Sequence, residues 1–404
     1  SVGLRHIRKN ATTLIPGHQM RPAWIEVNLN RLVNNLTLIR RHTDNRPVMA
    51  VVKANAYGHG LIEAARLYEK LGVEWLAVAV PEEGIQLRNS GLTTPILVFG
   101  GVLRHQIPEM IDNHLDHTVS SLENLQWTEV AIRKTGKKAR VHLKFDTGME
   151  RIGAPEHASA ELVEAAVRSP GLELRGVYSH LACADDPDSP KTLEQLKRFE
   201  ERLKLFRIQG AKVPMRHLAN SGGILHFPET HLDLVRPGII LYGVYPDPKS
   251  RRFLDLQPAL ALKARVVYSK TVKAGSPISY GPTWAPEEDI QAVTLPLGYG
   301  DGFRRDFSNR GAVLIRGQRR PIVGRVCMDQ FMVNMGRQEI PNGEDAVLIG
   351  NQGGETLEIE NLAEELGTIP YELLTGLNQR IPRIYHELEP GPSTAQKVYP
   401  SPSP

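Results

Sequence analysis

Short β-rich runs alternate with amphipathic helical segments along residues 22–255, and this rhythm constrains the fold more than any other feature of the chain. The runs expected to be strands cover residues 47–53, 74–80, 95–100, 116–120, 139–146, 172–181, 214–220 and 232–236. The clearest helical segment, residues 191–210, places Leu193, Leu196, Phe199, Leu203 and Phe206 three or four positions apart and ends at Gly210. Eight strands alternating with helices predict an α/β protein with an N-terminal (β/α)8 TIM-type barrel over residues 22–255.

The rhythm changes after residue 255. Alternating and β-branched runs, closely separated by glycine and proline turns, cover residues 264–271, 291–297, 312–316, 321–327 and 346–349. Helical periods follow at residues 359–365 and 371–377. The pattern predicts a smaller, mostly β C-terminal domain over residues 256–388. Residues 1–21 are expected to form an N-terminal extension, and the proline- and serine-rich residues 389–404 a disordered tail.

Composition excludes several classes of protein. The chain has 404 residues, 41% of them hydrophobic, with 49 lysines and arginines against 45 acidic residues. This near balance of charge does not favour a nucleic-acid partner, and no apolar run approaches the ~20 residues of a membrane span. Cys183 and Cys327 lie far apart in the chain and do not form a metal-like pair. A reducing, cytoplasmic compartment is the simpler interpretation, and one long-range disulfide stays open as the alternative. The first twenty residues lack the apolar segment of an intact signal peptide, and whether a leader has been removed stays open.

Lys53 is the strongest candidate for a catalytic group. The apolar run 48–52 leads directly into this lysine, and Asn55, Tyr57 and Gly58 follow it. An ammonium at the end of a core strand is costly unless it is used, and partial burial makes a lysine nucleophilic toward carbonyl groups. A lone lysine could instead reach solvent, but the donors that follow it suit an anionic phosphate. The run therefore predicts a lysine that forms a Schiff base.

Other polar residues stand where further barrel strands are expected to end. They are Asp146, His180, Asn220, Ser221 and Arg236. Active sites of such barrels form at the carboxyl ends of the strands, so these side chains and Lys53 are expected to meet. Each alone has an ordinary structural explanation, and their joint placement carries the argument.

Two segments near the last expected strands fit a phosphate site. Asn220-Ser221-Gly222-Gly223 offers a hydroxyl and two glycines, and Arg236-Pro237-Gly238-Ile239 follows the eighth strand. Loops after the seventh and eighth strands of such barrels commonly hold phosphate. Both segments could equally be ordinary turns, and the alternative is a phosphate cup of backbone N–H groups and a serine.

Seven motifs along the chain resemble those of the alanine racemase family. They are Val52-Lys53-Ala-Asn-Ala-Tyr57-Gly-His-Gly60, Lys144-Phe-Asp-Thr-Gly-Met-Glu-Arg151-Ile-Gly153, Asn220-Ser221, Arg236-Pro-Gly-Ile239, Ser279-Tyr280-Gly281, Gly298-Tyr299-Gly-Asp-Gly302 and Gly324-Arg-Val-Cys-Met328-Asp329-Gln330. The resemblance extends over residues 22–387. By itself, 298–302 fits neither a P-loop nor a dinucleotide fingerprint.

The resemblance implies a pyridoxal 5'-phosphate enzyme that interconverts L- and D-alanine and supplies D-alanine for peptidoglycan. Lys53 would bind the cofactor covalently and act as one catalytic base. Arg236 would bond the pyridine nitrogen, and His180 would link Arg236 toward a second base. Arg151 would contact the cofactor and the substrate carboxylate, and Lys144 matches a position that is carbamylated in many members. The phosphate would be held by Tyr57, Ser221, Gly238 and Ile239, with Asn220 beside them.

The resemblance also implies a homodimer with shared active sites. Tyr280, Met328 and Asp329 lie in the β domain and would reach the site of the other subunit. Tyr280 would be the second catalytic base, and Met328 and Asp329 would lie at the substrate. Two bases on opposite faces of Cα can racemise an amino acid without moving it.

Two alternatives stay open at this point. One is a broad-specificity amino-acid racemase of the same fold, and the other is a non-catalytic pyridoxal-phosphate-binding protein, against which the second domain argues. A departure bears on specificity: many members have a tyrosine before the final Arg-x-Pro-Arg, whereas Gln379 precedes Arg380-Ile-Pro-Arg383 here. We expect Gln379 to widen the substrate pocket, so that serine would be a measurable secondary substrate.

Overall fold

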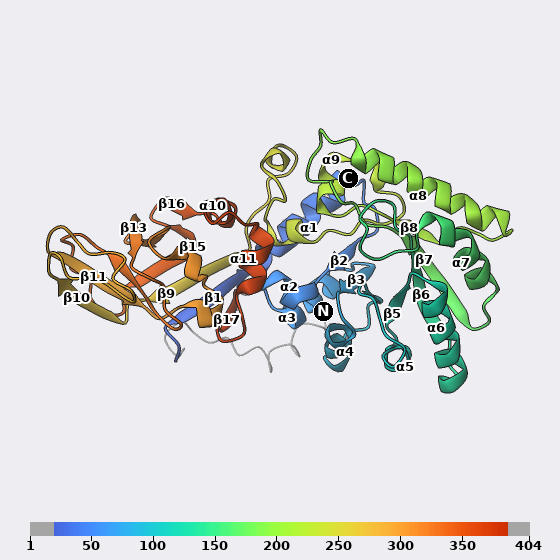
Figure 1. Cartoon of the computed structure of the whole chain (residues 1–404), viewed down its shortest axis with the longest axis horizontal. Helices are drawn as coiled ribbons and strands as arrows, with labels where there is room; N and C mark the ends of the chain where they lie inside the picture. The colour runs from blue at the N-terminus through green and yellow to red at the C-terminus, as the bar shows by residue number, and fades with distance from the viewer. Residues whose placement is uncertain (1–19, 387–404) are drawn as a thin grey trace, which may run out of the picture.

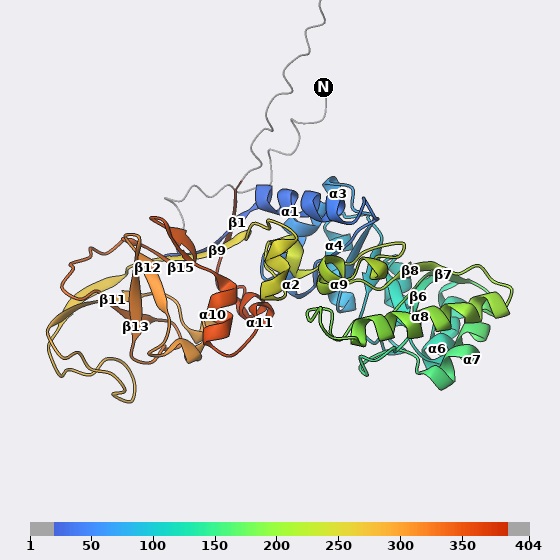
Figure 2. The ribbon, with the colours of Figure 1, turned by 90° about the horizontal axis from the view of Figure 1, so that it is seen from above.

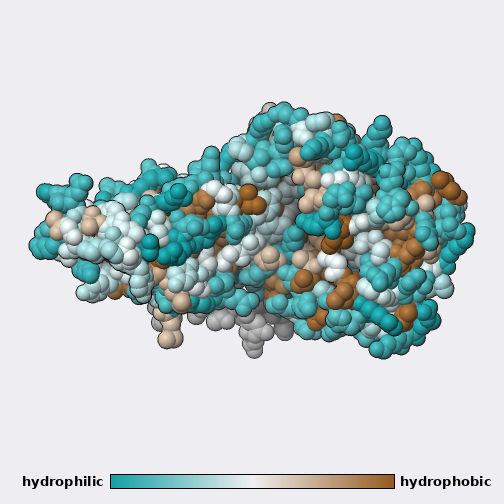
Figure 3. Space-filling view, viewed as in Figure 1, coloured by the Kyte–Doolittle hydropathy of each residue, from teal (hydrophilic) through white to brown (hydrophobic). Residues whose placement is uncertain are grey.

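The computed structural model describes residues 20–386, which form two lobes along one axis (Figure 1). The predicted tail lies outside these residues, as does nearly all of the predicted N-terminal extension. Hydrophilic residues cover most of the face shown in Figure 3, and the hydrophobic residues on it gather mainly over the barrel lobe. None of the helices in the described part combines the length and hydrophobicity that a bilayer-spanning helix needs.

Seven parallel strands form the barrel sheet in the order β2 to β8. They are β2 (Met49–Val51), β3 (Trp75–Val78), β4 (Ile96–Val98), β5 (Asp116–Val119), β6 (Ala139–Lys144), β7 (Leu172–Tyr178) and β8 (Met215–His217). The predicted eighth strand, residues 232–236, is reduced to single pairs: Leu234 bridges to His217, and Val235 to Val48. These bridges close the ring between β8 and β2, so the predicted barrel is confirmed and its eighth strand is much shorter than expected.

Helices surround this sheet on the outside, as Figure 2 shows for α6, α7 and α8. The helices of this lobe are α1 (Leu29–His42), α2 (Lys53–Tyr57), α3 (Leu61–Lys70), α4 (Pro81–Asn89), α5 (Ile107–Asp112), α6 (Leu122–Thr135), α7 (Glu156–Arg168), α8 (Lys191–Ile208) and α9 (Ser221–His226). Short 3-10 helices follow at η1 (Pro228–Thr230), η2 (Ile239–Tyr242) and η3 (Pro248–Arg252). All four residues of β3 and of β5 are buried, as expected for a parallel sheet covered on both faces.

Local sequence signals set the helix ends. Ser121 caps α6 by accepting a hydrogen bond from the Asn124 amide at 3.1 Å, and Gly136 ends it in a left-handed conformation with φ 68°. In α8 the predicted apolar stripe faces the core, except that Leu193 is exposed. The stripe is therefore core packing for most of its length.

The second lobe is a largely antiparallel sheet. Its strands are β9 (Leu260–Arg265), β10 (Tyr268–Val272), β11 (Ile290–Leu295), β12 (Ala312–Ile315), β13 (Gln318–Val323), β14 (Phe331–Asn334), β15 (Asp345–Gln352), β16 (Glu355–Leu357) and β17 (Arg383–His386). The other elements are η4 (Tyr299–Asp301), η5 (Arg305–Phe307), α10 (Ile359–Glu365) and α11 (Pro370–Gly376). The β character and both helices match the sequence prediction. The run predicted as one strand at residues 264–271 is divided between β9 and β10, and β14, β16 and β17 were not predicted.

Strand β1 (Ala23–Asn28) belongs to this second sheet and not to the barrel. It pairs antiparallel with β9 and parallel with β17, and Val27 lies opposite Tyr385. The predicted barrel range of residues 22–255 thus begins with a strand whose hydrogen bonds are with the other sheet. Helix α11 lies against α2 where the two lobes meet, beside the carboxyl ends of the barrel strands (Figure 1).

Candidate active site

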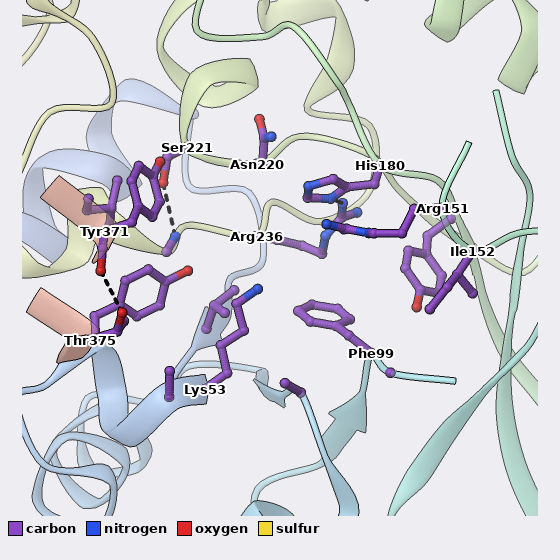
Figure 4. Close-up of a pocket in the computed structure, with 18 of the residues that line it drawn as sticks. Lys53, Phe99, Arg151, Ile152, His180, Asn220, Ser221, Arg236, Tyr371 and Thr375 are labelled. Carbon is purple, nitrogen blue, oxygen red and sulfur yellow. Dashed lines mark hydrogen bonds between the residues drawn. The ribbon is translucent and has the colours of Figure 1, made fainter. Parts of the chain in front are cut away.

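One cavity of about 460 Å³ opens at the carboxyl ends of the barrel strands. Ten of the predicted site residues line it: Lys53, Tyr57, Lys144, Arg151, His180, Asn220, Ser221, Arg236, Gly238 and Ile239. In Figure 4 the Lys53 amine points toward the middle of this group. Arg151, Arg236 and His180 lie on one side of it, and Ser221 and Tyr371 on another. The barrel thus brings together residues that are up to 186 positions apart in the chain.

The segment that carries Lys53 has an unusual backbone. Within α2, the φ angles of Ala54, Asn55, Ala56 and Tyr57 are 52°, 55°, 51° and 53°, so the segment is a turn of left-handed helix without glycine. This conformation costs roughly 1–2 kcal/mol for each residue with a side chain. The turn places both Lys53 and Tyr57 on the wall of one cavity. Strain of this kind at a candidate site indicates that the placement of these two side chains matters.

A cup forms on one side of the cavity from Tyr57, Ser221, Gly238 and Tyr371. The Gly238 amide donates to the Ser221 hydroxyl at 3.1 Å. A Cβ atom at position 238 would lie 2.5 Å from the Tyr57 hydroxyl oxygen, so only glycine lets the chain approach this closely. Tyr371 and Thr375 extend from α11 into the same wall. Tyr371 is a site residue that the sequence analysis missed.

Four cationic side chains meet in the cavity: Lys53, Lys144, Arg151 and Arg236. Burial lowers the pKa of Lys53, and Arg151 and Arg236 lower it further. For Lys144, burial and the same two arginines lower the pKa to about 8. Both amines are therefore more readily neutral, and more nucleophilic, than an exposed lysine.

Arg236 is buried, and groups in the barrel interior accept hydrogen bonds from its guanidinium. Its Nη2 donates to the carbonyl oxygens of Ser179 at 2.9 Å and Leu218 at 3.1 Å, and its Nη1 lies 3.1 Å from His217 Nδ1. The ring of His217 continues to His142, with Nε2 and Nδ1 2.9 Å apart. These supporting residues were not predicted from the sequence, because a histidine inside a strand is usually an ordinary core residue.

The histidine chain ends at a buried carboxylate. His142 Nε2 lies 3.4 Å from Asp116 Oδ2, and Arg175 Nε lies 3.6 Å from the same oxygen. Burial lowers the pKa of both His142 and His217, so both imidazoles are neutral near pH 7. The Asp116 charge is therefore connected to the Arg236 guanidinium through two neutral rings.

His180 and Asn220 complete the upper part of the site. His180 Nδ1 lies 3.5 Å from Arg236 Nη2, and burial, together with Arg236, lowers the pKa of His180 well below its usual value. The first link of the predicted chain from Arg236 toward Tyr280 is thus present at long hydrogen-bond distance. The Asn220 side chain accepts from the Gly223 amide at 3.0 Å, which fixes the start of α9 beside Ser221.

Three predicted residues lie outside this cavity, on the β domain. Tyr280 is 71% exposed and Met328 53% exposed, and Asp329 accepts a hydrogen bond from Arg380 at 2.7 Å. The loops of Tyr280 and Met328 are tied together, because the Ser279 hydroxyl donates to the Arg325 carbonyl at 2.6 Å. Exposed aromatic and thioether side chains on one pair of joined loops suit a surface that another molecule covers.

The expectation about Gln379 is corrected. Its side chain is exposed and lines a surface hollow with Asn55 and Leu61, not the cavity of Lys53. Tyr371, eight positions earlier, contributes the aromatic wall instead. Tyr385, another tyrosine near Gln379 in the chain, does not line the cavity and donates to the His59 carbonyl at 3.0 Å.

Comparisons with known proteins agree with this arrangement. The family model for the alanine racemase N-terminal domain matches residues 27–246, and that for the alanine racemase C-terminal domain matches residues 259–385. The chain is 42% identical over 371 residues to alanine racemase 2 of Caldanaerobacter subterraneus subsp. tengcongensis, covering 91% of this chain and 95% of that protein. It is 43% identical over 368 residues to the alanine racemase of Methanococcus maripaludis, covering 90% and 98%.

Solved structures give the same result. The crystal structure of alanine racemase from D-cycloserine-producing Streptomyces lavendulae superimposes with a TM-score of 0.88 at 37% identity, covering 92% of this chain and 98% of that one. The alanine racemase of Bacillus anthracis with bound L-Ala-P superimposes with a TM-score of 0.86, also at 37% identity, covering 91% and 96%. Both domains and their order thus agree, and the chain belongs to the alanine racemase family.

Proposed function

We propose that this protein is a pyridoxal-phosphate-dependent racemase that interconverts L- and D-alanine. One observation supports the proposal most directly. In the cavity, the Lys53 amine, whose pKa is lowered, lies between the cup that contains Ser221 and Tyr371 and the buried Arg236 guanidinium. The cofactor needs an amine for its aldehyde, donors for its phosphate and a partner for its ring nitrogen. The residues present fit all three needs.

Each side chain has a definite task in this proposal. Lys53 binds the cofactor aldehyde, and Tyr57, Ser221 and the backbone at Gly238 and Ile239 hold its phosphate. Arg151 orients the substrate carboxylate. When bound, the cofactor supplies the conjugated electron sink that makes an amino-acid Cα–H acidic enough to be removed. The Lys53 amine would exchange the proton on one face of Cα.

Arg236 determines how strong that sink is. A guanidinium has only donors and stays protonated, so a ring nitrogen that bonds to it must be unprotonated. Many pyridoxal enzymes place a carboxylate there, which holds the ring nitrogen protonated. An arginine at this position would therefore weaken the electron sink, which would favour return of the proton to Cα. This preference suits racemisation better than transamination.

The opposite face of Cα needs a second base, and we assign it to Tyr280 of a second copy of the chain. Tyr280 is exposed on the β domain and does not line the cavity of its own barrel. A homodimer in which each β domain covers the partner's barrel mouth would bring Tyr280, Met328 and Asp329 to the substrate. The proposal includes a cytoplasmic location and a supply of D-alanine for peptidoglycan.

The test is racemisation measured on single enantiomers. Purified protein with added pyridoxal phosphate should convert L-alanine to D-alanine and the reverse, approaching equal amounts of both. A panel of other single-enantiomer amino acids should show alanine as the preferred substrate. Faster turnover of a bulkier or charged amino acid would favour a broad-specificity racemase, and failure on every amino acid, despite cofactor binding, would leave a binding protein.

A further inference from the structure

Glu83 is an acidic residue that the reaction scheme above does not use, yet its carboxylate touches the segment that carries Lys53. It stands in the first turn of α4, which follows β3. Its Oε1 accepts from the Ala54 amide at 2.7 Å, and its Oε2 accepts from the Ala79 amide at 2.8 Å and the Val80 amide at 3.3 Å. One carboxylate thus ties together the segments that follow two neighbouring barrel strands.

The Ala54 amide is the peptide nitrogen that directly follows Lys53, and Ala54 is the first of the four left-handed residues. Other bonds stabilise the turn from within its own segment: the Ala56 amide donates to the Val52 carbonyl at 2.8 Å, and the Leu61 amide to Asn55 Oδ1 at 2.9 Å. Glu83 is different, because it attaches the start of the turn to another element. Its charge makes these hydrogen bonds stronger than neutral ones.

The neighbouring Glu82 provides a natural comparison. It occupies the same first turn of α4, so both acids interact with the same helix end. The Glu82 side chain is exposed and lines a surface hollow with Ile85, Gln86 and Asn89. Only Glu83, of these two, reaches the backbone beside Lys53.

The charge of Glu83 also acts on Lys53. Burial lowers the pKa of Lys53, Arg151 lowers it further, and Glu83 opposes both effects. A negative charge near a group of cations eases the repulsion that would otherwise push the lysine amine away from the arginines. Loss of this carboxylate would lower the pKa of Lys53 further, so the expected loss of cofactor uptake rests on the backbone tether and not on the charge.

We propose that Glu83 is a positioning residue, which holds the strained left-handed turn so that Lys53 and Tyr57 both face the cofactor cavity. The inference rests on the proposed function, because it takes Lys53 as the lysine that binds pyridoxal phosphate. The chemistry of the carboxylate explains its identity: it accepts on both oxygens. A glutamine would present an amide donor to one of the two sets of backbone donors.

The first experiment compares Glu83→Gln with Glu82→Gln in the full chain. The readout is the uptake of pyridoxal phosphate onto Lys53, trapped by borohydride reduction and located by peptide mass spectrometry, over a range of cofactor concentrations. We expect Glu83→Gln to need at least about tenfold more cofactor for half-uptake, and Glu82→Gln to match the wild type within about twofold. Equal uptake in both variants would overturn the proposal.

A second variant tests the turn itself. Glycine adopts left-handed angles at little cost, so Ala54→Gly relieves the strain at the position Glu83 holds. In the wild-type background, Ala54→Gly should change the cofactor concentration for half-uptake little. In the Glu83→Gln background, Ala54→Gly should lower that concentration by at least about threefold. No restoration would show that Glu83 does not act through the turn, and would overturn the inference.

Two further outcomes are also decisive. If Glu83→Gln alone does not fold, the double variant Glu83→Gln with Ala54→Gly decides the matter. A double variant that folds and binds the cofactor supports the proposal. A double variant that also fails to fold assigns Glu83 to the packing of α4. If the wild type takes up no cofactor on Lys53, the proposed function fails. Normal wild-type uptake with an unaffected Glu83→Gln variant rejects this inference alone.

Discussion

Arg236 donates through Nη1 to His217 Nδ1 across 3.1 Å, and this contact fixes the proton positions behind the guanidinium. An arginine has only donors, so His217 Nδ1 accepts and its Nε2 carries the proton. That proton points to His142 Nδ1 at 2.9 Å, so His142 in turn directs its own N–H toward Asp116. The group we assign to the pyridine nitrogen is thereby backed by two histidines, the second of which lies within ion-pair distance of the buried Asp116.

The first prediction concerns the end of this chain. Asp116 is fully buried, and its charge is opposed by Arg175 and, through the two histidines, by Arg236. Removing one partner from buried charges typically costs ~3–5 kcal/mol. We expect Asp116→Asn to lower the free energy of unfolding by about that amount in urea titrations.

A matched substitution separates this effect from a general loss of carboxylates. Asp112 is half exposed and pairs with the similarly exposed Lys137. We expect Asp112→Asn to cost less than ~1 kcal/mol, as is usual for surface pairs. Similar losses for the two variants would mean that Asp116 contributes no more than a surface carboxylate.

The second prediction is that Lys53 carries the cofactor. Reduction of the wild type with borohydride should fix pyridoxal phosphate to Lys53, and Lys53→Ala should lose both the linkage and racemisation. Lys144→Ala is the control, because Lys144 is a second amine of lowered pKa in the same cavity. Linkage at Lys144 in the Lys53→Ala variant would show that the cavity does not select between its two amines.

The third prediction is that two chains share each site. Lys53→Ala and Tyr280→Phe should each be inactive, and mixing them should restore activity. In a mixed dimer one of the two sites combines an intact Lys53 with an intact Tyr280. Labelled subunits must first be shown to exchange. Exchange without recovered activity would place Tyr280 in the site of its own chain.

The fourth prediction concerns carbamylation of Lys144. Its pKa of about 8 leaves half of the amine neutral at pH 8, whereas an ordinary lysine with a pKa of ~10.4 would be under about 1% neutral. A carbamate would also put an anion beside Arg151 and Arg236. We expect 13C-bicarbonate at pH 8 to give a carbamate NMR signal that weakens as the pH falls.

The assignment of that signal needs two variants. Lys144→Ala should abolish it, and Lys53→Ala should keep it. A signal that survives in Lys144→Ala would assign the modification to a different amine. Absence of any signal in the wild type at saturating bicarbonate would reject carbamylation.

The fifth prediction replaces the expectation drawn from Gln379. Since this side chain is exposed outside the cavity, Gln379→Tyr should leave the alanine-to-serine ratio of kcat/KM within about twofold of the wild type. A changed alanine-to-serine ratio in Gln379→Tyr would restore the interpretation that Gln379 widens the substrate pocket.

Tyr371 lines the cavity beside Ser221. We therefore expect Tyr371→Phe to weaken pyridoxal phosphate binding by about 0.5–1.5 kcal/mol, the usual value of one hydrogen bond.

The sequence predicted the barrel mouth well because strand ends of a parallel barrel share one rim. Lys53, His180 and Arg236 could be placed together from the strand pattern alone, whereas Asp146, predicted at the end of its strand, does not line the cavity, and Lys144 does. Tyr371 could not, because it lies on a helix of the second domain, and only the packing of α11 against α2 brings it to the rim. The exposed Tyr280 needed the family resemblance, since a single chain gives it no partner in the site.

Other misses have a local physical cause. Ala54-Asn55-Ala56-Tyr57 contains no glycine, and Asn55 alone among its residues favours left-handed angles, so the sequence does not predict a whole left-handed turn. Tertiary contacts such as that of Glu83 stabilise it. His142, His217 and Asp116 lie inside the barrel, where single polar residues in apolar strands give no pattern to read. Strand β17 is short, and its apolar character is interrupted by Arg383 and His386.

The pairing of β1 with β17 has a consequence for how this protein can be made and divided. The first described strand obtains one of its two neighbours only when residues 383–386 are present, so the small domain is completed by the two ends of the described chain. During synthesis, the barrel segment would emerge from the ribosome long before residues 383–386 are available to complete that sheet. Cutting the chain between residues 246 and 259 would leave Ala23–Asn28 on the barrel fragment. There this strand would have an apolar edge and no sheet to pair with. The two lobes are distinct in shape, but no single cut in the chain separates them, because the second sheet contains strands from before and after the barrel.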